Sequence, residues 1–538
     1  MEKKSYLRSI GGVMIIMLVG KLLALVASQV YMSTLDPDSE YLNIYSWAIT
    51  IPNNIFQSFG TALTSVVIPI FAALLVKEKK EEADHFASNV VCVSGTLTLV
   101  LVAAGIGLSF ALPSLTDFAD KSYTGMALRI MMPVMLFYCL CYIYQGILQS
   151  HGRFRSAALS NLPSGIMIIA YIMIYKWSLS GTVSNKAAVT GLLIVTAAGL
   201  FMQFAVLIIP AHRAGFRFRP VFDLKDPDLR TAGKMTVPII LGASAYQLNM
   251  FFNNTMMTNV ASDKVTLFNF VQNLIISSVM TMVLAITSVM YPTLTKHAAS
   301  DDMDSFKSTL TTTMGGTFFI LAPLTAGLIA LRTPLLSLIS MHGEVSYQNV
   351  LTESGFLLMY SFCIVFMGFK EIADRAFYSL KSTKISAITG VLIMAVNVAL
   401  GYVLSKYTPL GANGIPLAYS AAAAAGTVFL VLMLRRRIGA FGHGISATIV
   451  KSTVSSAIMG AAVYGVYVLL ARNGLEGTSV MTRLIYTVVP TLCGVIIYFI
   501  LSLVLKIPPM AKISDKLFLR GGGGNGGSAG GTINQKEA

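Results

Sequence analysis

The stretch TSVVIPIF at residues 64–71 recurs as TSVMYPTL at residues 287–294, which is 223 positions further along the chain. Both stretches end a long apolar segment, and each is followed by a charged segment that closes on a phenylalanine, KEKKEEADHF and TKHAASDDMDSF. A second match, of SHGRFRSA at 150–157 with SLKSTKIS at 379–386, has an offset of 229. Because the two offsets agree closely, the sequence predicts two related halves.

The composition predicts the environment of the protein. Of its 538 residues, 55% are hydrophobic and only 12% are charged. A soluble globular protein carries roughly 25% charged residues, so a multi-span membrane protein is expected. The apolar runs are about 20 residues or longer, which predicts helices and not barrel strands. Fourteen spans are predicted, at residues 8–31, 42–76, 86–112, 123–150, 156–176, 187–210, 232–260, 264–295, 308–332, 350–379, 385–405, 411–434, 445–471 and 481–505.

The repeat organises these spans. Spans one to six correspond to spans seven to twelve, and both sets begin on the same side of the membrane because six is an even number. In transporters with this parallel-repeat plan, the substrate site lies between the halves, near the middle of the membrane. We therefore expect an all-α integral membrane protein with two pseudosymmetric six-helix lobes plus two C-terminal helices. The predicted domains are lobes at 1–222 and 223–440, helices 13 and 14 within 441–506, and a flexible Gly-rich tail at 507–538.

The net charge of +15 is interpreted as a signal of membrane orientation. If the N-terminus lies in the cytoplasm, most of the 39 Lys and Arg residues fall in inner loops and tails, as in KEKK, HGRFR and RRR. This predicts that both termini are cytoplasmic and does not favour nucleic acid as a partner. The sequence has no nucleotide-binding loop, metal-ligand spacing or nucleophile–base pair in a convincing context, so neither a cofactor nor enzyme activity is expected.

Polar residues inside the apolar spans indicate a site. In the second span a polar residue recurs every three or four positions, which predicts a stripe on one helix face: Asn43, Ser46, Thr50, Asn53, Gln57, Thr61 and Thr64, with Asn54 beside it. A weaker stripe follows the eighth span through Asn269, Asn273, Ser277, Thr281 and Ser288, with Gln272 adjacent, and the seventh span adds Ser244, Gln247, Asn253 and Asn254. Single Ser and Thr positions favour bonding between helices, whereas the Asn- and Gln-rich stripe favours a wet cavity.

Lys21 is the most informative single residue of the first span, and it shares a helix face with Ser28. It lies about 20 Å along the helix, where a cation needs an anionic ligand, a counter-charge or water. For Lys370 of the tenth span, a local pair with Glu371 is the alternative to a substrate contact. The candidate substrate-binding residues are Lys21, Ser28, Asn53, Asn54, Gln57, Gln247, Asn253, Gln272, Asn273 and Lys370.

Five stretches in order carry a resemblance to a known family: IPNNIFQSFGTALTSVVIPIFA at 51–72, YQGILQSHGRFRSAALSNL at 144–162, VPIILGASAYQLNMFFNN at 237–254, LAITSVMYPTLTKHAA at 284–299 and AFYSLKSTKISA at 376–387. Together they resemble the MurJ/MviN lipid II flippases of the MOP transporter superfamily. The resemblance implies two six-helix lobes around a cationic cavity lined by helices one, two, seven and eight, with a lipid-facing groove at helices thirteen and fourteen. It also implies alternating access that carries a polyprenyl-pyrophosphate-linked sugar across the bacterial cytoplasmic membrane, with membrane lipids and cell-wall synthesis enzymes as further partners.

The chain departs from this family where cavity charges are expected. Family members carry arginine at the position of Lys21, an Arg-Asp pair at Ala27 and Ser28, arginine at Phe56, and an Asp-Arg pair at Gln272 and Asn273. The leading hypothesis is a flippase for a lipid II-like precursor. The missing arginines leave open a flippase for exopolysaccharide or teichoic-acid repeat units, and also a scaffold that does not transport. A cation-coupled drug exporter is disfavoured, because neither stripe contains a carboxylate.

Overall fold

The computed structural model describes residues 2–179, 181–380, 382–441, 445–471, 474–475, 478–508 and 510, although some side chains inside its helices lie outside this description. Within these residues the chain is all-helical and has no strand. The first half contains α1 (Glu2–Thr34), α2 (Glu40–Val76), α3 (Lys80–Leu108), η1 (Leu112–Leu115), α4 (Lys121–Met131), α5 (Val134–Ser150), α6 (Phe154–Leu159), α7 (Pro163–Ile174), η2 (Tyr175–Leu179) and α8 (Asn185–Ala214). The remainder contains α9 (Pro227–Val260), η3 (Ser262–Lys264), α10 (Val265–Ala299), α11 (Met303–Ile339), α12 (Tyr347–Ser361), α13 (Ile364–Ser379), α14 (Thr383–Tyr407), η4 (Gly411–Asn413), α15 (Gly414–Ile438), α16 (Ile445–Leu470) and α17 (Val480–Val504).

The prediction of a multi-span helical membrane protein is confirmed. Each of the fourteen predicted ranges coincides with one helix or with a run of shorter helices. Within the described residues, nine helical segments are long and apolar enough to cross a membrane, and the bent pair α12 and α13 adds a tenth. The count of fourteen spans stays a prediction.

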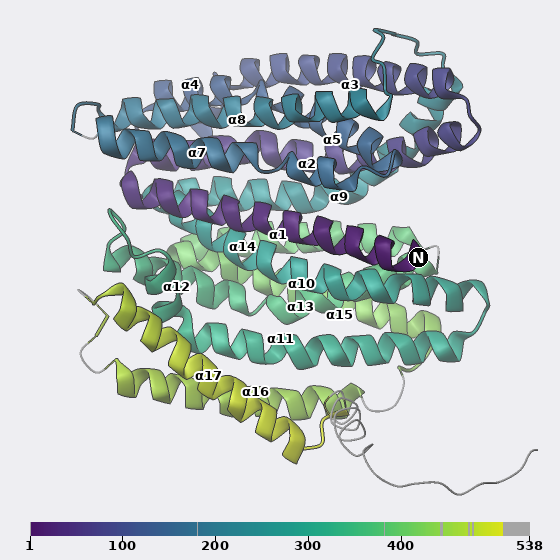
Figure 1. The fold of residues 1–538 in the computed structure, drawn as a ribbon. Helices are drawn as coiled ribbons and strands as arrows, with labels where there is room; N and C mark the ends of the chain where they lie inside the picture. Colours follow the sequence, from purple (N-terminus) through teal and green to yellow (C-terminus); the bar gives the residue numbers. More distant parts are fainter. Residues whose placement is uncertain are drawn as a thin grey trace, which may run out of the picture.

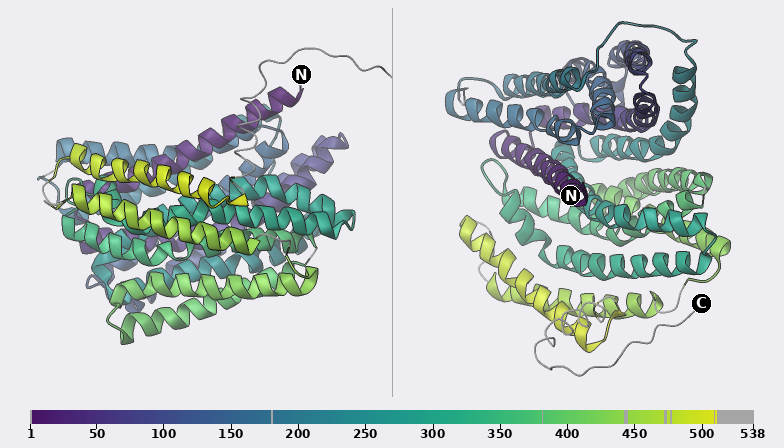
Figure 2. Two further views of the ribbon diagram at one scale, coloured as in Figure 1. Left: turned by 90° about the horizontal axis from the view of Figure 1, so that it is seen from below. Right: turned by 45° about the vertical axis from the view of Figure 1, so that its right-hand side comes forward.

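The helices form two neighbouring bundles with two helices between them. Figure 1 shows α2 to α8 on one side and α10 to α15 on the other, while α1 and α9 lie between these groups. Helix α9 packs along α2 of the first group and along α14 of the second. Helices α16 and α17 pack against α11 at the edge of the second bundle, as both views of Figure 2 show.

The same helix of the repeat is interrupted in both halves. The fourth predicted span divides between α4 and α5 beside Pro133, and the tenth divides between α12 and α13, which meet at a bend of 40°. Pro133 explains the first break, because proline cannot donate the backbone hydrogen bond that would continue the helix. The second break has no proline, yet α13 begins 230 positions after α5, close to the offset of 229 in the second sequence match.

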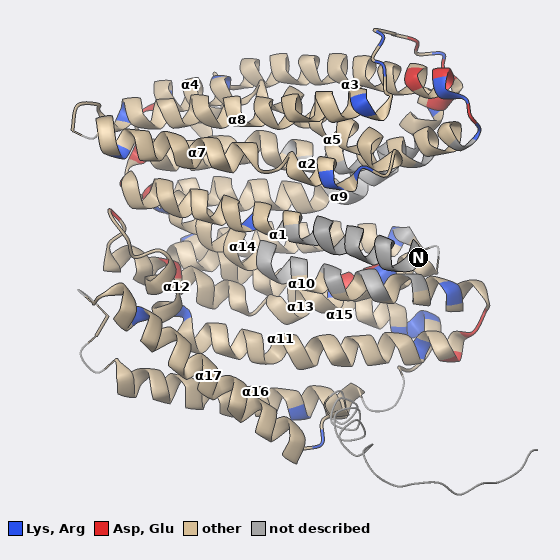
Figure 3. Ribbon diagram, in the orientation of Figure 1, with Lys and Arg blue, Asp and Glu red and all other residues tan. Residues whose placement is uncertain are grey.

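The two ends of the bundle differ in charge. The α1–α2 end is defined here as the end at which α1 stops and α2 starts, together with the α9–α10 and α11–α12 turns. The opposite end holds the α2–α3 and α8–α9 connections and the last turn of α15, where Lys and Arg residues gather (Figure 3). Exposed basic residues at that end include Lys77, Lys79, Arg153, Arg217, Arg219, Arg435 and Arg436.

Hydrogen bonds join the two halves at the α1–α2 end. Asn43 of α2 donates to the carbonyl oxygen of Asp263 at 3.0 Å. The hydroxyls of Ser46 and Thr266 lie 2.9 Å apart, and the Asn269 side chain donates to the Ser46 carbonyl oxygen at 3.3 Å. Polar residues of the two predicted stripes therefore contact each other and hold the two halves together at the α1–α2 end.

Candidate functional site

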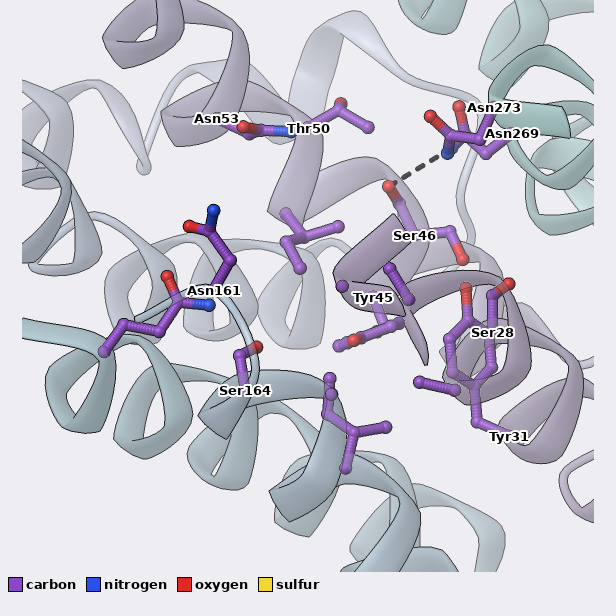
Figure 4. A pocket seen from close by; sticks show the side chains of 17 residues that line it. Ser28, Tyr31, Tyr45, Ser46, Thr50, Asn53, Asn161, Ser164, Asn269 and Asn273 are labelled. Carbon is purple, nitrogen blue, oxygen red and sulfur yellow. Dashed lines mark hydrogen bonds between the residues drawn. The ribbon is translucent and has the colours of Figure 1, made fainter. Parts of the chain in front are cut away.

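A cavity of about 250 Å³ adjoins these contacts, because Ser46 and Asn269 also line it. Its walls come from α1, α2, α7, α8 and α10 and from the link between α6 and α7 (Figure 4). The lining residues are Gly20, Ala24, Ala27, Ser28, Tyr31, Tyr45, Ser46, Ile49, Thr50, Asn53, Asn161, Ser164, Gly165, Ile168, Gln203, Asn269 and Asn273. Fifteen of these residues belong to the first half and two to α10, so the described cavity lies mainly in the first half, at its border with the second.

The face of α2 supplies one wall of the cavity. Ser46, Thr50 and Asn53 are spaced by four and three residues, so the helix presents them on one side. Asn53 lies about 20 Å from the start of α2 at 1.5 Å per residue, yet its side chain is exposed because it faces the cavity. The Thr50 hydroxyl donates to the Trp47 carbonyl oxygen at 2.7 Å, which holds that side chain against its own helix.

Close packing of α1 on α7 supplies the second wall. A Cβ atom added at Gly165 would lie 2.9 Å from Leu23 Cγ, so the absence of a side chain there lets the two helices approach. Just before α7, Asn161 points its amide into the cavity, and Ser164 follows in the first turn of the helix (Figure 4). Gln203 of α8 completes this wall.

Among the residues that the structure describes, the lining combines polar and apolar side chains and carries no charge. It contains four Asn side chains, one Gln, Ser and Thr hydroxyls and two Tyr rings, and none of its seventeen residues is acidic or basic. Carboxamides donate and accept hydrogen bonds, and hydroxyls do both, which suits a ligand rich in hydroxyl and amide groups. Lys21 directly follows the lining residue Gly20, and its side chain is exposed.

Three of the predicted site residues line the cavity: Ser28, Asn53 and Asn273. The cavity also uses Asn161, Ser164 and Gln203, which the sequence did not single out. Asn161 lies within one of the stretches that carry the family resemblance, and this was the one feature of the sequence that could have indicated Asn161 as a site residue. Asn161 and Ser164 lie three residues apart at the start of α7, and Gln203 lies in α8, so no long stripe of polar residues marks them.

Other predicted site residues lie outside the cavity lining. Gln272 donates to the Tyr360 hydroxyl at 2.9 Å, and the Asn253 side-chain oxygen accepts from Asn397 at 2.6 Å. Asn54 and Gln247 are buried in α2 and α9. The side chain of Gln57 lies outside the described residues. Binding roles for these four residues and Gln57 stay predictions.

The alternative of a local pair between Lys370 and Glu371 is wrong, while a substrate contact of Lys370 stays a prediction. Lys370 Nζ lies 2.6 Å from Asp374 Oδ2, while Arg375 contacts Glu371 at 2.8 Å. Both pairs are four residues apart on α13, which is the helical spacing that places side chains on one face. Adjacent residues point away from each other, so Lys370 and Glu371 cannot pair in a helix.

Comparisons with known proteins agree on one family. The family model described as lipid II flippase MurJ matches residues 38–485. A probable lipid II flippase MurJ of Thermotoga maritima is 24% identical over 483 residues, covering 88% of this chain and 92% of the relative. Its counterpart from Bdellovibrio bacteriovorus is 23% identical over 491 residues, covering 88% and 90%.

Solved structures show the same fold. A lipid II flippase MurJ in an inward closed conformation has a TM-score of 0.74 at 20% identity, covering 91% of this chain and 97% of the other. An inward-facing multidrug resistance MATE transporter of the MOP superfamily has a TM-score of 0.64 at 18% identity, covering 79% and 98%. Since the family model spans more than half of the chain, the protein belongs to the lipid II flippase MurJ family.

Proposed function

We propose that the protein is a flippase that carries a polyprenyl-pyrophosphate-linked, lipid II-like cell-wall precursor across the bacterial cytoplasmic membrane by alternating access. The observation that carries the proposal is the cavity at the border of the two halves, whose described lining offers amide and hydroxyl groups and no charge. A sugar headgroup cannot cross hydrocarbon without replacing its hydrogen bonds to water, and this lining offers such replacements. The polyprenyl tail needs no such site, because it is soluble in the bilayer.

In this mechanism Lys21 attracts the pyrophosphate. It directly follows the lining residue Gly20 but is not itself among the lining residues; its side chain is exposed, and a lysine ammonium acts on phosphate as a compact point charge. Asn53, Asn161 and Asn273 then bond the sugars or the attached amides. Relatives described as flippases of lipid II support this choice of cargo class.

The proposed moving parts are the lobes 1–222 and 223–440, with helices 13 and 14 (441–506) beside the second lobe. The basic opposite end is proposed to face the cytoplasm, which places both termini there. The α1–α2 end then faces outward. Its interlobe hydrogen bonds describe a state that is closed to the outside, and their rupture would open the cavity to that side.

A flippase for another polyprenyl-linked glycan, such as an exopolysaccharide or teichoic-acid repeat unit, is the second candidate. It is favoured by one observation, the absence of charged residues among the seventeen that line the cavity. A lining without charge offers hydrogen bonds to any glycan and therefore does not favour one glycan over another. Contacts with cell-wall synthesis enzymes stay a prediction in either case.

Proteoliposomes containing the purified protein test the proposal. Lipid II and a second polyprenyl-pyrophosphate with a different glycan are placed in one leaflet, and their appearance in the other is followed over time. Faster movement of lipid II than in protein-free vesicles is expected, with an Asn53→Leu/Asn273→Leu variant much slower. Movement of only the second lipid would favour the second candidate, and movement of neither would refute a flippase.

A further inference from the structure

A buried carboxyl group lies at the α1–α2 end, outside the cavity lining. Glu353 of α12 is 0% exposed and lies beside Ser340, the residue that ends α11. Its Oε2 atom is 2.5 Å from the Ser340 hydroxyl, and its Oε1 atom has no hydrogen-bond partner within the described residues. A carboxylate without a counter-charge is one of the most costly groups to bury.

Hydrogen bonding around Ser340 suits a protonated Glu353. The Ser340 hydroxyl oxygen lies 2.8 Å from the Leu336 carbonyl oxygen as well as 2.5 Å from Glu353. If Glu353 carries a proton, it donates to the Ser340 hydroxyl, and that hydroxyl donates onward to Leu336. If Glu353 is ionised, the single hydroxyl proton can serve only one of these two acceptors.

The neighbouring elements offer no cation to Glu353 within the described residues. Arg483 of α17 donates to the carbonyl oxygens of Met341 and Thr478, at 2.5 and 2.7 Å. Burial, followed by the nearby Arg483 charge, lowers the pKa of His342 in the α11–α12 turn, which favours its neutral form. Glu344 of the same turn is exposed, and Lys264 beside α10 pairs with Asp38. Gln272 of α10, Asn413 just before α15 and Tyr419 of α15 carry no formal charge.

The same residues fasten the first half to the second. Gln29 of α1 donates to the Ser340 carbonyl oxygen at 2.9 Å, and the Glu344 N–H donates to the Ser33 carbonyl oxygen at 3.0 Å. Gly343, with φ of +59°, lies so close that a Cβ atom there would overlap Ser33. We call Gln29, Ser33, Ser340, Gly343 and Glu344 the α1 latch. Ser340 is the common member, because its carbonyl group binds α1 and its hydroxyl group binds Glu353.

We propose that Glu353 is a proton-binding site whose occupancy is linked to the α1 latch. When α1 leaves the α11–α12 turn, water enters at Ser340, the O–H bond of Glu353 breaks, the carboxylate keeps the electron pair, and the proton passes to water at this end. Closure expels the water and the carboxyl group takes a proton back. The closed state therefore binds the proton more tightly, and by linkage an alkaline pH at this end favours opening.

This proposal rests on the alternating-access part of the proposed function and not on the cargo. The test measures the distance between two spin labels in the absence of substrate. The five native cysteines are first replaced, and the labels are then attached at Ser114→Cys in η1 and Gln348→Cys in α12. Both positions are exposed and they belong to different halves. In the unsubstituted protein, we expect the share of long label-to-label distances to rise between pH 5 and pH 9.

Two variants sharpen the test. Glu353→Gln, which resembles the protonated acid, is expected to remove the pH-dependent change and keep the short distance throughout. Asp117→Asn removes an exposed carboxylate between η1 and α4, outside the α1 latch, and is expected to keep the change. A distance distribution that does not vary with pH, or one that varies equally in Glu353→Gln, overturns the proton site. If added lipid II still changes the distances in that case, the proposed function survives without it.

Discussion

Thr266 donates its backbone N–H to the side-chain oxygen of Asn43 at 2.7 Å, and the two residues are 223 positions apart. This is also the offset between TSVVIPIF and TSVMYPTL. The next bond along the helices, from Asn269 to the Ser46 carbonyl oxygen, has the same offset. Residues that correspond in the repeat therefore contact each other, which is expected where an axis of pseudosymmetry passes between two subunit-like halves.

Replacing Asn43 by alanine tests how much this contact stabilises the closed state. The substitution leaves the Thr266 N–H and the Asp263 carbonyl oxygen without their Asn43 partners. Loss of buried hydrogen bonds costs about 1–3 kcal/mol, so a lower melting temperature in detergent is expected. Asn259→Ala, at an exposed position of α9, serves as the control and should melt like the unsubstituted protein. Equal melting of both variants would contradict a stabilising role for Asn43.

Asn53→Leu tests the cavity wall on α2. The leucine removes a donor and an acceptor that face the cavity while keeping a similar size. One lost hydrogen bond of about 1 kcal/mol corresponds to roughly a fivefold slower transport, measured as the initial rate of lipid movement in proteoliposomes. Gln348→Leu, at an exposed site away from the cavity, is the matched control. An unchanged rate for Asn53→Leu would remove this residue from the site.

Lys21 tests the contribution of positive charge beside the cavity. Lys21→Ala is expected to abolish complementation of a flippase-depleted strain, and Lys21→Arg to retain it, because the arginine keeps the charge. Membrane levels of both variants, measured by immunoblot, control for folding. Full growth of the strain with Lys21→Ala would refute attraction of the pyrophosphate by this residue.

Asn397→Leu separates a structural role of Asn253 from a binding role. Asn397 of α14 donates to the side-chain oxygens of Asn249 and Asn253 on α9, at 2.5 and 2.6 Å, and all three residues are buried. The leucine leaves both oxygens without this donor, so destabilisation by about 1–3 kcal/mol is expected in thermal unfolding. Transport per folded molecule should stay close to normal. A strong loss of transport without destabilisation would instead restore Asn253 to the substrate site.

Some of the predicted site was recoverable from the sequence because it follows from helix periodicity. Ser46, Thr50 and Asn53 recur at helical spacing, and a helix in any fold presents them on one face. Asn161, Ser164 and Gln203 lack such a pattern, since each enters the cavity only through the packing of α7 and α8 around α1. Their role depends on neighbours that are distant in the chain.

The amino-acid sequence by itself determined the membrane location, the helical class, the repeat and the polar face of α2, because hydrophobicity and spacing act within one helix. Only the tertiary structure decided which polar residues are satisfied by protein and which remain to face a cavity. Asn253, Gln272 and Lys370 resemble Asn53 and Asn273 as polar residues in apolar helices, yet each has a protein partner: Asn397 donates to the Asn253 side-chain oxygen, Gln272 donates to Tyr360, and Lys370 pairs with Asp374. The physical reason is that a buried polar group takes whichever partner the packing brings within reach.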